Sequence, residues 1–481
     1  EEYEDFKKRH KTSKVKYRDL EDYEGPIYVG LDAGSTTSKM VWLSKDMEIL
    51  LDDYRMNLGN PLEVTIDMLK EGYKKKNPKA YLASSGICGY GEDFIKNALH
   101  VDNGEVETIA HYRAARFFNP DVDFILDIGG QDMKAMHIRD GVIDSIQLNE
   151  ACSSGCGSFL STFAASVSMD VKEFQQEAIK SKKPADLGSR CTVFMNSKVK
   201  QAQKEGSEVA DIAAGLCYSV IKNAIQKVIK IRDPKTLGEN IVVQGGTFYG
   251  DAILRAFEKL SEREVTRPEI AGLMGAMGMA LISKDRSTGT SKLAALNDLE
   301  DFSYEQKSAR CGRCTNNCAL IINVFSDGRK YITGNRCERG AGVKIDKSKD
   351  DFNMYKFKYD LLFNRETLGE KARFGTVGIP RVLNIYEDYP FWHRFFTSLG
   401  FDIILSDKSN REIYEKGISS ISSETACYPA KLTHGHIENL LEKNPDMIFY
   451  PAVFYEYKQY DKAKNHMNCP VVSGYPDVIE N

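Results

Sequence analysis

The sequence predicts an α/β protein with more than one domain. Three observations predict it: a strand–turn–strand pattern that occurs twice between residues 26 and 139, the helical stretches that follow, and a further alternation of strand and helix patterns over 374–481. At about 100–200 residues per domain, the 481 residues allow roughly two to four domains. Hydrophobic residues make up 42% of the chain, which is enough for packed cores and too many for a disordered chain.

The charge balance excludes some classes of protein. Lys and Arg number 65 and Asp and Glu number 69, so the formal net charge is −4. This balance argues against a protein that binds nucleic acid through a basic surface. The longest apolar stretch, residues 270–282, is short and broken by glycines, so no membrane span is predicted. We expect a cytoplasmic protein and, since the chain does not begin with Met, a piece of a longer polypeptide.

Shifts in composition predict the domain organisation. We expect a charged linker over 1–25 with a helix near 3–10, an α/β domain over 26–284, a linker over 285–306, a Cys-rich module and connector over 307–373, and a C-terminal α/β domain of βαβ units over 374–481. The pattern at the chain end is compatible with a truncated last domain.

Each element of the first α/β domain is predicted from its pattern. Runs rich in Val, Ile and Leu that end in small polar turns indicate strands, at 27–31, 39–43, 80–84, 123–126, 134–139 and 241–243. Apolar residues at helical spacing indicate helices, at 61–73, 154–169, 171–181, 195–205, 209–231 and 268–281. In the last domain the alternating segments are 377–386, 391–399, 403–405, 431–441 and 447–450.

Two Asp-x-Gly turns between strands are candidate phosphate-binding loops. Their glycines let backbone N–H groups approach a phosphate closely, and Ser35, Thr36 and Thr37 add hydroxyl donors to the first turn. Asp32 and Asp127 would hold Mg²⁺ or orient an attacking water. A single turn of this kind is an ordinary hairpin turn, but two copies about 95 residues apart, with a later Gly245-Gly246 turn after another strand, favour a nucleotide site.

This set of turns resembles the actin, Hsp70 and hexokinase superfamily of ATPases. The chain lacks a Gly-x-x-x-x-Gly-Lys-Ser/Thr loop, so it is not a P-loop enzyme. The resemblance implies that the first two turns hold the phosphates of ATP with Mg²⁺ and that the late Gly-Gly turn meets the adenosine. The residues that it assigns to these contacts are Asp32, Gly34, Ser35, Thr36, Asp127, Gly129, Gly130, Gln131, Gly245 and Gly246.

Two cysteine segments separate this chain from sugar kinases and chaperones of that fold. Cys152 and Cys191 each come just before a predicted helix, where unpaired N–H groups and the helix dipole lower the pKa of a thiol and favour an anionic ligand. These segments resemble the activators of 2-hydroxyacyl-CoA dehydratases, the BadF/BadG/BcrA/BcrD ATPase family, in a large multidomain form. In that family one Cys of each segment binds a [4Fe–4S] cluster between two ATPase domains, and Cys152 and Cys191 occupy those positions.

The number of thiolates agrees with a shared cluster. A [4Fe–4S] cluster normally takes four thiolates, so two cysteines per domain require a second ATPase domain, from another copy or from the same polypeptide. Cys156 departs from the smaller activators and is not counted as a ligand, and neither are Cys88 and Cys217. The resemblance implies that ferredoxin or flavodoxin supplies an electron, and that ATP hydrolysis drives it into a CoA-ester dehydratase or reductase. The alternatives are a small-molecule kinase of the same fold and a nucleotide-gated scaffold.

A second group of cysteines predicts another metal site. Four thiols around a predicted hairpin suit tetrahedral ligation of Zn²⁺ or an Fe–S cluster, and an iron–sulfur family favours Fe–S. They are Cys311, Cys314, Cys318 and Cys337. The remaining alternative is four thiols that bind no metal. The last domain resembles the extra domain of large activases, and Cys427, just before a helix, is a candidate cluster ligand there. Cys469 is a weaker candidate.

Overall fold

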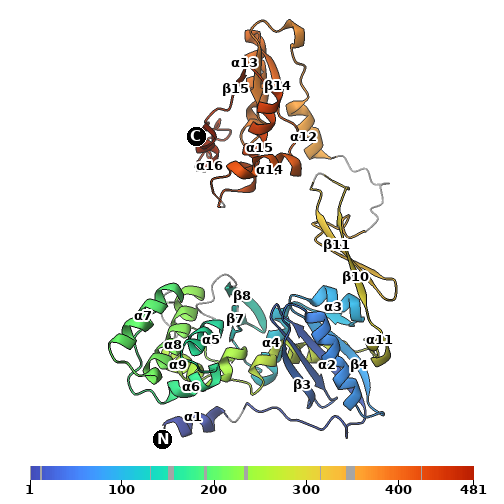
Figure 1. The fold of residues 1–481 in the computed structure, drawn as a ribbon, viewed down its shortest axis with the longest axis vertical. Helices are drawn as coiled ribbons and strands as arrows, with labels where there is room; N and C mark the ends of the chain where they lie inside the picture. The colour runs from blue at the N-terminus through green and yellow to red at the C-terminus, as the bar shows by residue number, and fades with distance from the viewer. Residues whose placement is uncertain are drawn as a thin grey trace. The chain divides into compact units, whose positions relative to one another are not determined.

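The computed structural model divides the chain into two compact units, residues 1–303 and residues 304–481 (Figure 1). The structure describes residues 2–10, 13–130, 132–149, 157–188, 192–231, 237–314, 316–342, 353–423 and 425–480. Each unit is treated below by itself.

The first unit begins with a five-stranded sheet. Its strands are β1 (Pro26–Ala33), β2 (Thr37–Leu43), β3 (Ile49–Met56), β4 (Tyr81–Cys88) and β5 (Asn103–Gly104). They lie in the order β3-β2-β1-β4-β5, with β1 antiparallel to β2 and parallel to β4. The helices α2 (Pro61–Lys75) and α3 (Glu92–Leu99) connect these strands.

A second sheet repeats the start of this arrangement. Its strands β6 (Phe124–Ile128), β7 (Met133–Arg139), β8 (Val142–Asn149) and β9 (Ile241–Gln244) lie in the order β8-β7-β6-β9. The elements between and after them are α5 (Gly157–Ser166), α6 (Val171–Ile179), α7 (Thr192–Lys204), α8 (Val209–Asn223), the π-helix η2 (Ala224–Val228), the 3-10 helix η4 (Gly246–Tyr249) and α9 (Asp251–Ser261). Both sheets therefore place an acid at the end of a central strand, Asp32 in β1 and Asp127 in β6.

Two helices, α4 (Glu107–Phe118) and α10 (Met274–Asp285), pack closely against each other, and α10 also packs against β1, β2 and β4 of the first sheet. Their contacts depend on glycine. A Cβ atom at Gly278 would lie 1.8 Å from the backbone oxygen of Ala110 in α4, and one at Gly30 would lie 1.9 Å from the backbone oxygen of Ala276. The backbones of β1, α4 and α10 are thus in direct contact, which fixes the first acidic turn relative to α4. The 3-10 turn η5 (Ala271–Leu273) precedes α10, and α11 (Leu296–Glu300) ends the unit.

The N-terminal segment contains the helix expected near 3–10, but this helix is docked on the first unit and is not solvated on all sides. Residues Glu2–His10 form α1, and the side chain of Phe6 is buried in the core around the second sheet. Arg9 and His10 contact the buried Glu258 of α9, at 3.0 and 3.1 Å. The sequence did not predict this docking because most of the segment is charged. The contacts come from one aromatic residue, Phe6, and from the pairing of Arg9 and His10 with Glu258.

The second unit contains two small sheets. The strands β10 (Tyr304–Arg310), β11 (Ala319–Phe325) and β12 (Lys330–Thr333) form an antiparallel sheet. A parallel sheet follows, β14-β13-β15, from Thr376–Ile379 (β13), Asp402–Leu405 (β14) and Met447–Ile448 (β15). Its helices are α12 (Met354–Phe363), α13 (Ile385–Leu399), α14 (Arg411–Gly417), α15 (Tyr428–Lys443) and α16 (Pro470–Glu480), with 3-10 turns η6 (Gly369–Lys371) and η7 (Ile418–Ser420). The strand expected over 377–386 is shorter, because Pro380 cannot donate to a ladder and α13 begins at Ile385.

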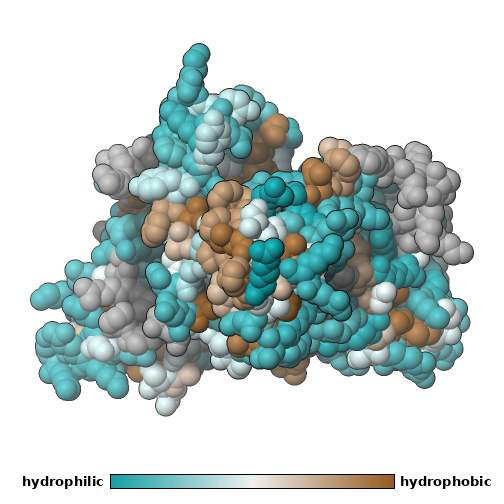
Figure 2. Space-filling view, turned by 90° about the horizontal axis from the view of Figure 1, so that it is seen from above, coloured by the Kyte–Doolittle hydropathy of each residue, from teal (hydrophilic) through white to brown (hydrophobic). Residues whose placement is uncertain are grey.

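Hydrophilic residues cover most of the face seen in Figure 2, and hydrophobic residues lie between them in separate patches. Within the described part of the chain, none of the helices has the length and apolar character needed to cross a membrane.

Candidate functional site

The first acidic turn, between β1 and β2, is held in place by local hydrogen bonds. The Gly34 N–H donates to the oxygen of Thr37 (2.9 Å), and Asn57 donates through Nδ2 to the oxygen of Gly34 (2.8 Å). Asp32 is buried and accepts a bond from Lys39 Nζ at 2.8 Å through Oδ2. The other oxygen, Oδ1, is buried and has no hydrogen-bond partner among the described residues, so it is available to a ligand.

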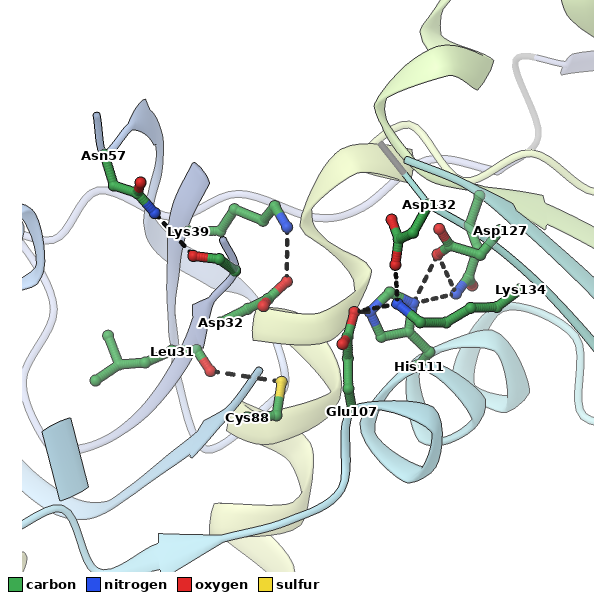
Figure 3. Close-up of polar contacts among 12 residues, drawn as sticks. Leu31, Asp32, Lys39, Asn57, Cys88, Glu107, His111, Asp127, Asp132 and Lys134 are labelled. Carbon is green, nitrogen blue, oxygen red and sulfur yellow. Dashed lines mark hydrogen bonds and ion pairs between the residues drawn. The ribbon is translucent and has the colours of Figure 1, made fainter. Parts of the chain in front are cut away.

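The second acidic turn, between β6 and β7, has different partners. His111 Nδ1, from α4, lies 2.7 Å from Asp127 Oδ2, and Gln244 Nε2, from β9, lies 3.0 Å from the same oxygen. Beside them, Lys134 Nζ contacts Glu107 and Asp132, each at 2.6 Å. Figure 3 shows the Asp32–Lys39 pair on one side of α10 and this group on the other.

The structure brings the three predicted turns together. Because β9 lies parallel to β6 with Gln244 opposite Asp127, the Gly245-Gly246 turn lies beside the second acidic turn. Gly245 has φ +92°, and a Cβ there would lie 2.3 Å from the oxygen of Ile128, so only glycine fits. A Cβ at Gly275, in the first turn of α10, would lie 2.6 Å from Asp32 Oδ2 and 2.9 Å from His111 Nε2. One point on α10 thus lies against Asp32 of the first turn and against His111, which contacts Asp127 of the second turn.

The charges around this point are closely matched. Four carboxylates (Asp32, Glu107, Asp127 and Asp132) lie with three basic side chains (Lys39, His111 and Lys134). Burial alone would raise the pKa of Asp127, but the charge and hydrogen bond of His111 hold it well below its ordinary value. Burial alone would lower the pKa of Lys39 and of His111, but the adjacent carboxylates, Asp32 and Asp127, raise both. Even with His111 protonated, the carboxylates of this group exceed its cations by one.

Six residues of this network were absent from the site predicted from the sequence. They are Lys39, Glu107, His111, Asp132, Lys134 and Gln244. A weak signal exists for one of them, since His111 is the only imidazole on a helix face otherwise lined by small residues such as Ala110 and Ala114. The role of His111 depends on its contact with Asp127 of β6, and the sequence pattern of the helix does not indicate that contact.

Comparisons with known proteins identify the family of the first domain. Residues 29–283 match the BadF/BadG/BcrA/BcrD ATPase family, and residues 376–481 match a CoA enzyme activase uncharacterised domain. The chain belongs to the BadF/BadG/BcrA/BcrD ATPase family. The family membership and the two mixed sheets confirm the predicted actin/hexokinase-like ATPase fold of the first domain, and they agree with a larger multidomain form.

Relatives in this family carry activator names. The (R)-2-hydroxyglutaryl-CoA dehydratase activating ATPase of Acidaminococcus fermentans is 29% identical over 256 residues, which cover 53% of this chain and 95% of the relative. A 2-hydroxyisocaproyl-CoA dehydratase activator of Clostridioides difficile is 30% identical over 266 residues, 55% of this chain and 97% of the relative. A solved activator of that dehydratase from Clostridium difficile, with bound ADPNP, has 30% identity and a TM-score of 0.48, and covers 54% of this chain and 94% of that one.

Three predicted site residues of the ATPase domain lie outside the described residues: Gln131, Cys152 and Cys191. Cys156 does too. The described helices α5 and α7 begin shortly after the two cysteine segments, at Gly157 and Thr192. Cys88 and Cys217 are buried, and burial raises the pKa of both thiols, that of Cys217 to about 12. Neither thiol has the ionised character of a ready metal ligand.

The cysteines of the second group lie at one end of the β10–β12 sheet. Cys311 follows β10, Cys318 precedes β11 and Cys337 follows β12, and the Cys311 N–H donates to the oxygen of Cys318 (2.9 Å). Cys314 is in the loop between the first two and is exposed. Among the described residues, no three His, Cys, Asp or Glu side chains are arranged closely enough to hold a metal ion. The strand order therefore places these four cysteines at the same end of the sheet. A metal site there remains a prediction.

Cys427 is the N-cap residue of α15 and is exposed. Two histidines follow it on the helix and are buried. His436 bonds to Ser406 (2.8 Å) and Ser409 (2.9 Å), and burial lowers its pKa to about 4. His434 bonds to Ser420 (3.0 Å) and Tyr475 (3.2 Å). Both imidazoles use their nitrogens within the protein, which indicates a structural role.

Proposed function

We propose that this chain couples ATP hydrolysis to low-potential electron transfer from a [4Fe–4S] cluster, shared between two ATPase domains, to a 2-hydroxyacyl-CoA dehydratase or a related CoA-ester reductase. The observation that carries the proposal is the pair of buried acids at the ends of β1 and β6, linked through His111 beside α10, in a chain whose relatives are named as activating ATPases of such dehydratases. Those names favour an activase over a small-molecule kinase or a scaffold.

The first acidic turn suits Mg-ATP. Asp32 Oδ1 is buried without a partner among the described residues, and carboxylate oxygens are ligands that Mg²⁺ prefers. Bound Mg²⁺ would supply charge neutralisation at the phosphates. In this proposal Asp32 faces the metal, Asp127 and Gln131 orient the attacking water, and Lys39 balances the charge of Asp32. The small residues of the three turns, Gly34 to Thr37, Gly129, Gly130, Gly245 and Gly246, would hold the nucleotide.

The second acidic turn is connected to the first cysteine segment. The N–H groups of Gly157 and Ser158, at the start of α5, donate to the oxygens of Gly129 (2.9 Å) and Gly130 (2.8 Å). Cys152 lies five residues before Gly157 in the sequence. A movement of the turn on nucleotide binding or hydrolysis would therefore pass directly to the segment that carries this cysteine.

Cys152 and Cys191 would hold the cluster, whose chemistry is the supply of one electron at low potential. Moving an electron uphill by about 300 mV requires roughly 7 kcal/mol, at about 1.4 kcal/mol per 59 mV, which ATP hydrolysis can supply. The partners in this proposal are a second ATPase domain, ferredoxin or flavodoxin as donor and a CoA-ester enzyme as acceptor. A second metal would bind Cys311, Cys314, Cys318 and Cys337, with Fe–S favoured over Zn²⁺, and Cys427 is a further candidate ligand.

The test is anaerobic purification with iron, sulfide and zinc analysis, followed by equilibrium dialysis with Mg-ATP. Cys152→Ser and Cys191→Ser should lose cluster iron and dehydratase activation and still bind Mg-ATP. Cys217→Ala, which changes a buried thiol outside the proposed site, should keep both. Absence of Mg-ATP binding would overturn the nucleotide site, and full activation by an iron-free protein would overturn the redox role.

A further inference from the structure

A buried histidine holds one of the two nucleotide acids in a defined orientation. His111, Asp127 and Gln244 are 6%, 4% and 0% exposed, so water does not compete for their contacts. They come from three elements, α4, β6 and β9, and meet at a single carboxylate oxygen, Asp127 Oδ2. Such a contact among separate elements fixes the side chain more firmly than a contact within one turn.

The protons of this group can be assigned from its chemistry. An ionised carboxylate only accepts, so at 2.7 Å from Oδ2 the His111 Nδ1 atom carries a hydrogen and donates it. Gln244 Nε2 also lies 2.7 Å from Nδ1, but a protonated Nδ1 does not accept, so the amide hydrogen goes to Asp127. Among the described residues, both hydrogen bonds to Asp127 thus engage Oδ2, and Oδ1 keeps its lone pairs for a ligand.

The other nitrogen of His111 faces the rest of the site. Nε2 is buried, has no hydrogen-bond partner among the described residues, and lies 3.6 Å from Glu107 Oε1. The position of a Cβ at Gly275 lies within 2.9 Å of it and 2.6 Å of Asp32 Oδ2. The imidazole therefore lies between the two acidic turns and contacts only one of them by a hydrogen bond.

We propose that His111 is a positioning residue for Asp127: its Nδ1–H, with the amide of Gln244, holds Oδ2 and presents Oδ1 to the hydrated Mg²⁺ or the attacking water. The inference rests on the proposed function, because that proposal gives Asp127 its role. It adds a requirement for a donor at the Nδ1 position of residue 111, and it assigns no direct contact between His111 and the nucleotide.

Two amide substitutions separate this role from a general need for a buried side chain. The amide nitrogen of Asn reaches the position of Nδ1, whereas that of Gln reaches the position of Nε2. His111→Asn should therefore keep most of the wild-type kcat for ATP hydrolysis. His111→Gln, with similar bulk, should lower kcat roughly 10- to 100-fold with little change in KM, since a small displacement of a positioned group has an effect of that order.

The control is His137→Asn, on the same sheet. His137 pairs with Phe124, three residues along the strand from the pair formed by Asp127 and Lys134, so its substitution should leave kcat unchanged. A spectroscopic readout that does not depend on turnover accompanies the kinetics. In protein labelled with ¹⁵N-histidine, one Nδ1–H resonance should show a strong hydrogen bond and shift in Asp127→Asn, with the other histidines unaffected.

Each outcome of these experiments either supports or contradicts the positioning role of His111. Rescue by Asn and not by Gln, with the Nδ1–H resonance dependent on Asp127, supports the positioning role. Equal kcat in the Asn and Gln variants, whether both are active or both are impaired, overturns it and leaves the proposed function standing. A wild-type protein that binds Mg-ATP but does not hydrolyse it overturns the proposed function, and with it the role of Asp127.

Discussion

The two acidic turns occupy equivalent places in two similar sheets, yet their carboxylates are held differently. Asp32 is paired with one lysine from the adjacent strand and keeps a buried oxygen without a partner among the described residues. Asp127 is held by a histidine and an amide from two distant elements. The repeated fold therefore supplies the position of each acid, and the surrounding side chains leave a buried oxygen of Asp32 without a partner among the described residues while they hold Asp127 by two hydrogen bonds.

Replacing each acid by its amide tests the comparison most strongly. Asp32→Asn and Asp127→Asn should each lower ATP hydrolysis by roughly 10²–10⁴-fold. Their stabilities should differ. Asp32→Asn leaves the ammonium of Lys39 without its partner, at about 3–5 kcal/mol, whereas in Asp127→Asn the adjacent His111 can lose its proton. Thermal denaturation of both variants checks this difference, and equal melting temperatures would contradict it.

Gly275→Ala should disturb both turns at once. The added methyl would lie 2.6 Å from Asp32 Oδ2 and 2.9 Å from His111 Nε2, so at least one side chain must move. A displacement of this size should lower kcat by roughly 10- to 100-fold. The matched control is Gly474→Ala on α16, where a Cβ meets nothing within 4 Å. Steady-state ATPase assays of the two variants decide, and equal activity would show that the turns tolerate the methyl.

Lys39→Met should make the thermal stability of the protein depend more strongly on Mg²⁺. Without the lysine, Asp32 is a buried carboxylate that lacks its cation, and Mg²⁺ then becomes its main counter-charge. The variant should therefore bind Mg²⁺ with a lower Kd, and at one fixed Mg²⁺ concentration its rise in melting temperature should be larger than that of the wild type. A concentration of about 100 times the Kd corresponds to roughly 2.7 kcal/mol. Lys45→Met, an exposed lysine just after β2, is the control. An identical Mg²⁺ response in both would contradict the role of Lys39.

The smallest expected effect is a pH dependence of stability at the second turn. The pKa of His111 lies above its ordinary value of 6.5, so its contribution is complete below pH 6.5 and is lost as the pH rises through the folded-state pKa. The pKa of Asp127 is lowered, so its contribution is present above pH 3.8 and is lost on acidification. The groups facing His111 are Asp127, Glu107, Lys134 and Asp32. From pH 6 to 9 the melting temperature should fall more in the wild type than in His111→Asn, and parallel curves would contradict this.

Much of the first unit could be predicted from the sequence, because strand and turn signals recur around both acids. The missed elements include the strands β3 and β8 and the helices α3, α4 and α9. β3 contains Asp52, Asp53 and Arg55 and forms an edge of its sheet, so its pattern is too polar to indicate a strand. β8 is also an edge strand, and none of its residues is buried. Edge strands lack the apolar face on which prediction depends.

The candidate site was predicted where the chemistry lies within one turn, and missed where it depends on packing. Asp32 and Asp127 stand beside glycines in the sequence. Lys39 and Gln244 become site residues only through register, because the first lies opposite Asp32 on β2 and the second opposite Asp127 on β9. His111 needs the packing of α4 as well. Local sequence shows which groups are reactive, whereas their partners are set by elements far apart in the chain.

The glycine contacts of α10 limit how this sequence can vary. Positions 275 and 278 meet a carboxylate, an imidazole and a backbone oxygen where a side chain would be. A library with both positions randomised and selected for ATP hydrolysis should return almost only glycine there, although glycine has no functional group. Selection at these positions would act on the absence of a side chain. A search for functional residues that considers only reactive groups would overlook two of the least replaceable residues in the domain.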